Sequence, residues 1–165
     1  MSQSFTLTQK FAASREHVLA ARERRFEDLS KHDGVKKQEI LSETHEGAVK
    51  ITKRAFSLAD KVPDMVKSMM PAGFLNLTET ARFDTETKTN RFDVTYEQNP
   101  DRMQIKGETK YIDEGENSSR REYNITVKVN IPLVGSLLEI QIASSFKKGI
   151  EKDYQNIQDI LAAEK

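Results

Sequence analysis

The sequence contains no cysteine and no tryptophan, and only seven glycines and four prolines among its 165 residues. The lack of cysteine excludes disulfides, thiolate metal ligands and cysteine nucleophiles, and it is typical of proteins in a reducing compartment. No glycine-rich phosphate loop, nucleophile elbow or dinucleotide fingerprint occurs. The sequence therefore predicts no bound cofactor.

Net charge is also absent, because 26 basic residues balance 26 acidic ones and the two signs are mixed along the chain. Nucleic-acid-binding domains usually carry a basic excess on one face, so we expect no nucleic-acid partner. No apolar run approaches the ~20 residues of a membrane span, and no charged segment followed by an apolar one opens the chain, as in a secretory signal. We expect a cytoplasmic protein, with residues 1–165 forming one domain and no stable membrane insertion.

The last third of the chain carries the clearest pattern, a strand followed by one long amphipathic helix. Over residues 119–130, Tyr123, Ile125 and Val127 alternate with polar residues, which indicates a half-buried strand. A helix is then predicted almost to the last residue, with Ser136 and Glu139 as a capping box. Apolar side chains recur at three- and four-residue steps along it and form one stripe: Ile142, Phe146, Ile150, Tyr154, Ile157 and Leu161.

The earlier part of the chain is predominantly strand-like. Residues 4–11 alternate, with Phe5, Leu7 and Phe11 on one face, and one or two short helices follow from Arg15 to about residue 30. Turn-rich breaks then separate further strands, which predicts antiparallel pairing; these strands span 35–46, 48–57, 74–84, 90–97 and 102–113. The predicted fold is α+β: a curved antiparallel sheet of six or seven strands wrapped around a long C-terminal helix, with two short helices after the first strand.

This order of elements resembles the START-like (SRPBCC, helix-grip) superfamily, and most closely an uncharacterised bacterial START-like family. Two segments carry the likeness: Ser4-Phe5-Thr6-Leu7-Thr8 running into Phe11-Ala12-Ala13-Ser14, and Ile131-Pro132-Leu133-Val134-Gly135 opening the last helix. The resemblance implies a hydrophobic cavity between sheet and helix and the binding of a lipid or small molecule. It supplies no fixed catalytic set.

The expected cavity can be assigned to residues on the concave sheet face and the helix stripe. Two tyrosines among them would orient a ligand through their hydroxyls within an apolar surround; in the alternative, all these side chains simply pack as core. The predicted lining residues are Met103, Ile105, Tyr111, Tyr123, Ile125, Val127, Leu138, Ile142 and Phe146.

A methionine-rich segment over residues 62–70 is the predicted entrance to the cavity, through Met65, Met69 and Met70. Methionine is flexible and polarisable, which suits a surface that repacks around different ligands. In the alternative, the segment is a short helix that closes one end of the sheet.

The charged candidates predict little chemistry. Arg22, Arg24 and Arg25 interleave with acidic residues at helical spacing, which is typical of a solvated helix face. The three histidines are scattered without zinc-site spacing, so no metal is predicted. Glu43 and His45 share one face of a strand and form the nearest approach to an acid–base pair.

The leading hypothesis is non-enzymatic binding or carriage of an apolar small molecule or lipid, with no catalytic residues. One alternative is a cyclase-type enzyme that uses a polar pair in the same cavity, with His45 or Glu79 as the first residues to test. The other alternative is a protein-interaction module with a filled core, acting through its charged outer strands.

Overall fold

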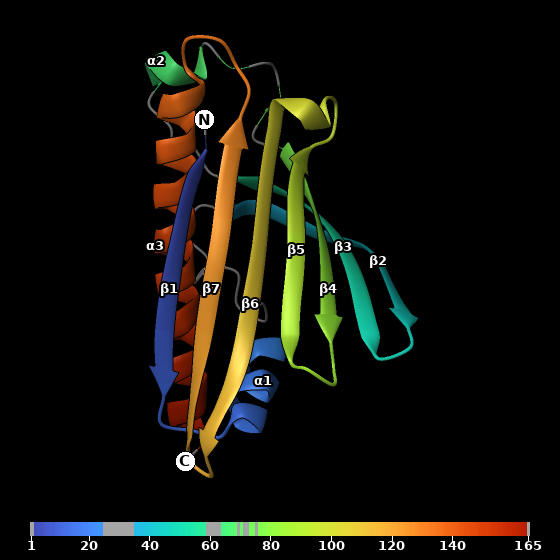
Figure 1. Ribbon diagram of the computed structural model, residues 1–165, viewed down its shortest axis with the longest axis vertical. Helices are drawn as coiled ribbons and strands as arrows, with labels where there is room; N and C mark the ends of the chain where they lie inside the picture. Colours follow the sequence, from blue (N-terminus) through green and yellow to red (C-terminus); the bar gives the residue numbers. More distant parts are fainter. Residues whose placement is uncertain are drawn as a thin grey trace.

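The structure is a computed structural model, and it describes residues 2–24, 35–58, 64–68, 70, 73–74 and 76–164. Within these residues, seven strands form one curved antiparallel sheet in the order β1-β7-β6-β5-β4-β3-β2, and a long helix runs along its β1–β7 edge (Figure 1). This arrangement confirms the predicted helix-grip fold. The elements are β1 Gln3–Phe11, α1 Arg15–Glu23, β2 Val35–Glu46, β3 Val49–Leu58, α2 Asp64–Lys67, β4 Asn76–Asp84, β5 Thr89–Tyr96, the 3-10 helix η2 Pro100–Arg102, β6 Met103–Gly115, β7 Ser118–Val129 and α3 Gly135–Ala163.

The first of the two predicted short helices is α1. Ser14 caps it as expected, because its Oγ accepts a hydrogen bond from the backbone N–H of His17 at 3.2 Å. Residues 25–34, where the second short helix was expected, lie outside the described part of the chain.

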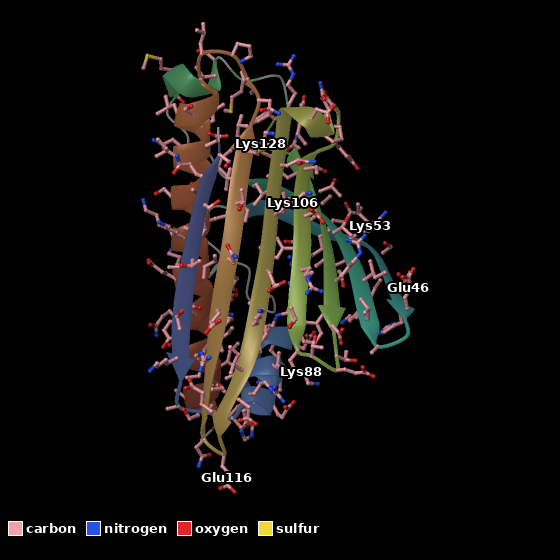
Figure 2. All side chains as sticks on the ribbon, in the orientation of Figure 1. Glu46, Lys53, Lys88, Lys106, Glu116 and Lys128 are labelled. Carbon is pink, nitrogen blue, oxygen red and sulfur yellow. The ribbon has the colours of Figure 1, made fainter. Side chains whose placement is uncertain are left out.

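The register defines two sheet faces with different chemistry. Directly paired residues share a face, so Val94, Ile105 and Val127 lie together on the inner face, which packs against α3. The outer face is charged, and Figure 2 shows Lys106 and Lys128 projecting from it toward the viewer. A ligand site between sheet and helix therefore has to be built from the inner-face residues.

The core consists of two clusters joined by α3, which packs against β7, β1 and α1. Leu138, Ile142 and Ile150 belong to the first cluster, on the inner sheet face. Ile157 and Leu161 belong to the second, which includes residues of α1 and lies at the α1 end of the molecule. The predicted apolar stripe is thus confirmed.

Among the described residues, no helix is both long enough and apolar enough to cross a membrane.

The predicted capping box at the start of α3 is wrong. The helix begins at Gly135, and Glu139 is fully buried, with its Oε2 accepting a hydrogen bond from the backbone N–H of Val129 at 2.9 Å. A tertiary hydrogen bond to β7 therefore replaces the local cap. The close approach also requires glycine at position 135, because a Cβ there would lie 2.6 Å from the Val129 carbonyl oxygen.

Candidate ligand-binding site

Most of the predicted lining residues lie in the first core cluster, between the sheet and α3. The most deeply buried, each at most 2% exposed, are Met103, Ile105, Ile125, Val127, Leu138 and Ile142. Tyr123 and Phe146 pack against this cluster and are half-buried. Tyr111 is buried in the second cluster instead. Most of the predicted lining residues thus belong to the apolar first cluster, and Tyr111 belongs to the second cluster at the α1 end of the molecule.

On the inner face, a glycine of β6 lies opposite an aromatic ring of β5. Gly107 lies opposite Phe92, and a Cβ at position 107 would lie 2.2 Å from the Cζ of the Phe92 ring. The missing side chain on β6 therefore makes room for an aromatic ring from β5. This shapes the apolar wall between Ile105 and Thr109.

A fully buried arginine, absent from the predicted set, lies at the α1 end of the inner face. Arg121 of β7 donates hydrogen bonds to Gln9 Oε1 from Nε at 3.0 Å and Nη2 at 2.6 Å, and to Asp153 Oδ2 from Nη1 at 3.0 Å. Its guanidinium also lies 5.0 Å from the ring centre of Tyr123. Gln9 belongs to β1 and Asp153 to α3, so one side chain joins three elements.

The electrostatic surroundings keep Arg121 charged. Burial by itself lowers the pKa of the guanidinium, but attraction to Tyr123, Tyr111 and Asp153 raises this pKa above its ordinary value. Both predicted orienting tyrosines thus lie beside a permanent positive charge. Arg121 and these two tyrosines therefore form a polar region at the α1 end of the inner face.

Arg22 corrects the prediction of a solvated arginine face on the first helix. Its side chain is only 14% exposed, and its guanidinium lies 5.2 Å from the ring centre of Phe83 and 5.8 Å from that of Tyr111. Arg22 sits at the same helical phase as the buried Val18, which explains why it turns inward. Arg24 is half-exposed and pairs with Glu164, as expected of the solvated face. Arg25 lies outside the described residues.

Two further polar features lie on the inner face. Arg54 of β3 donates from Nε to Glu79 Oε1 of β4 at 3.0 Å, and this pair is mostly buried in line with Val94. Asn90 of β5 is also buried, between Phe83 and Thr109 of the neighbouring strands. The inner face is therefore apolar where the first core cluster packs against α3, and more polar at Arg121, on β3 and β4, and at Asn90 of β5.

The Glu43–His45 pair does not form an isolated acid–base couple. Both residues are exposed, and Glu43 accepts a hydrogen bond from Lys50 Nζ at 2.8 Å, which lowers the pKa of Glu43. Among the described residues, no group of three or more histidines, aspartates or glutamates is placed to hold a metal ion.

The predicted entrance is described in part. Met65 of α2 is 72% exposed, Met70 packs against the first core cluster, and Met69 lies outside the described residues. A separate recess of about 480 Å³ lies at the β7–α3 junction, with Pro132, Leu133 and Glu139 among its lining residues. None of the predicted lining residues borders this recess.

The chain was compared with known protein families and with curated proteins. The family described as "Protein of unknown function (DUF2505)" matches residues 6–161, so the chain belongs to this family. No curated protein matches the chain.

Three solved structures illustrate the shared fold. TTHA0849 from Thermus thermophilus has a TM-score of 0.65 at 20% identity, over 99% of this chain and 100% of that one. A START superfamily protein from Mycobacterium smegmatis has a TM-score of 0.61 at 12% identity, over 95% and 98%. Norcoclaurine synthase from Thalictrum flavum, in complex with dopamine and hydroxybenzaldehyde, has a TM-score of 0.67 at 12% identity, over 100% and 89%. The chain thus has a START-like fold, as its sequence predicts.

Proposed function

We propose that this protein binds or carries an apolar small molecule or lipid between the inner face of the sheet and α3. The observation that carries the proposal is the incomplete burial of apolar side chains on this face. Phe5, Leu7, Ala81, Tyr123 and Phe146 all contact the first core cluster yet keep part of their surface exposed. Covering apolar surface stabilises a complex by ~25 cal/mol per Å² before the costs of association.

The predicted lining and entrance residues form one path in this proposal. A ligand would pass Met65 and Met70 and come to rest against Tyr123 and Phe146. The fully buried residues behind them, such as Ile105 and Leu138, would form the rigid wall. Because these wall residues expose no surface, uptake relies on the half-buried side chains moving aside.

The first test is native mass spectrometry of protein purified from the organism that encodes it, followed by organic extraction and mass analysis. The proposal predicts a defined hydrophobic compound bound in a fixed ratio. A protein without any such compound, which also takes up no apolar dye, would contradict it. That result would favour an interaction module with a filled core.

A second candidate, a cyclase-type enzyme, is favoured by the Arg54–Glu79 pair, because it places an acid and its counter-charge on the inner face. Norcoclaurine synthase is by its name an enzyme with this fold. Here the test compares compounds extracted from the wild-type protein and from Glu79→Gln. An enzyme would accumulate a precursor on the variant, whereas a carrier would hold the same compound on both.

A matched control for this comparison is Glu108→Gln. Glu108 also pairs with an arginine, Arg91, at 3.0 Å, but on the outer face of the sheet. The control should leave the extracted compound unchanged under either hypothesis.

A further inference from the structure

One polar atom on the inner face is buried without a partner. Asn90 is 8% exposed, and within the described part of the chain its Oδ1 accepts no hydrogen bond. Buried polar groups in native proteins are nearly always paired, because an unmade hydrogen bond carries the full cost of desolvation. An orphaned acceptor at this depth therefore calls for an explanation.

The surroundings of Asn90 are those of a ligand wall. Its directly paired neighbours are Phe83 on β4 and Thr109 on β6, and Phe92 follows two residues along the same face of β5. Phe83 and Ala81 on β4 are only half-buried, so this part of the inner face keeps accessible surface. A ligand lying against these side chains would bring its own atoms to Asn90 once the Phe83 ring moves aside.

We propose that Asn90 is the polar subsite of the ligand site and recognises a hydroxyl or N–H group on an otherwise apolar molecule. An amide oxygen only accepts hydrogen bonds, so the ligand must supply the donor. This inference rests on the proposed function and narrows the ligand class to apolar molecules that carry one donor.

The consequence is discrimination between otherwise similar ligands. A ligand with the donor pairs Oδ1, whereas one without it leaves this oxygen buried and unpaired. A single neutral hydrogen bond of this kind changes affinity by about tenfold. The apolar contacts are the same for both ligands and cancel in the comparison.

The test uses 2-naphthol and naphthalene, which differ by one hydroxyl, titrated against the wild-type protein by fluorescence and calorimetry. The wild-type protein should bind 2-naphthol about tenfold more tightly. Asn90→Leu should lose this preference while still binding naphthalene. Asn124→Leu, on the outer face of β7 where the residue is exposed, should keep it.

Each outcome decides the inference. Equal affinity of the wild-type protein for both ligands, or a preference that survives in Asn90→Leu, would overturn the Asn90 subsite and leave the proposed function standing. Failure of both ligands to bind the wild-type protein would overturn the Asn90 subsite, and together with the absence of any extracted hydrophobic compound it would overturn the proposed function as well. If Asn90→Leu does not fold, Asn90→Val supplies a side chain suited to a strand and serves the same comparison.

Discussion

Arg121 and Asp153 are joined inside the molecule by a hydrogen bond of 3.0 Å from Nη1 to Oδ2, which connects β7 to α3. The arginine side chain exposes no surface, whereas that of Asp153 exposes 14%. Removing one member of a buried ion pair leaves the other charge without compensation. The pair therefore matters more for keeping sheet and helix together than the exposed ion pairs of the outer face.

The first prediction concerns this pair. Arg121→Met should lower the free energy of unfolding by about 3–5 kcal/mol, measured by urea denaturation. Arg120→Met, one residue earlier, removes a partly exposed arginine that pairs with Glu122 and Glu114, and should cost much less. Similar losses in the two variants would show that burial of Arg121 is not what makes it important.

Two glycine substitutions should have opposite signs. Gly107→Ala should destabilise the protein by about 1–3 kcal/mol, because its methyl group overlaps the Phe92 ring and forces it to move. Gly149→Ala lies inside α3, where the new methyl group would have no atom within 4 Å apart from the adjoining backbone of the helix itself, and should stabilise by about 0.5–1 kcal/mol. Thermal and urea unfolding would measure both, and a stabilised Gly107→Ala would refute the crowding argument.

Filling the ligand site should reduce uptake without unfolding the protein. Phe146→Trp enlarges a half-buried side chain beside the first core cluster, and the variant should take up less of an apolar dye at unchanged secondary structure. Ile140→Trp, on the exposed side of the same helix, is the matched control. Undiminished dye uptake by a folded Phe146→Trp would remove Phe146 from the site.

Acid should selectively weaken the turn between β4 and β5. The Asp84 carboxylate accepts hydrogen bonds from the backbone N–H groups of Thr87 and Glu86, which lower the pKa of Asp84 in the folded protein. The unfolded chain, with an aspartate pKa of about 3.9, therefore binds the proton more readily. This contribution to stability is present above about pH 4 and is lost as the pH falls through the folded-state pKa.

The variant Asp84→Asn tests this pH dependence, because asparagine keeps an acceptor oxygen and does not ionise. Its stability relative to the wild-type protein, measured by urea unfolding, should be lower at pH 6 and should recover as the pH falls below about 4. A difference that stays constant with pH would contradict the role of the Asp84 charge.

Periodicity predicted the fold because each element repeats its own burial pattern. Ile142, Ile150 and Ile157 recur at helical spacing, and Ile125 and Val127 alternate, so local sequence alone defines their buried faces. The same alternation, extended two residues back from Tyr123, places Arg121 on the inner face. We did not predict Arg121 to be buried, because it is charged and lies between two other charged residues.

The polar contacts of the site could not be predicted, because their partners lie far apart in the chain. Arg121 meets Gln9 across 112 residues and Asp153 across 32. Glu139 has the spacing of a local cap but bonds to Val129 on β7 instead. The hydrogen-bond partners of Arg121 and Glu139 depend on how the sheet packs against α3, and a short segment of sequence does not specify that packing.

The sheet order places β1 beside β7, so residues 3–11 form their hydrogen bonds with residues 118–129. During synthesis, β1 therefore remains unpaired until the ribosome has made residues 118–129, which form β7. Contacts between such distant segments slow folding, because a long loop must close before they stabilise anything. We expect a slow folder whose partly made chains expose a strand edge, and which therefore depends on chaperones during synthesis.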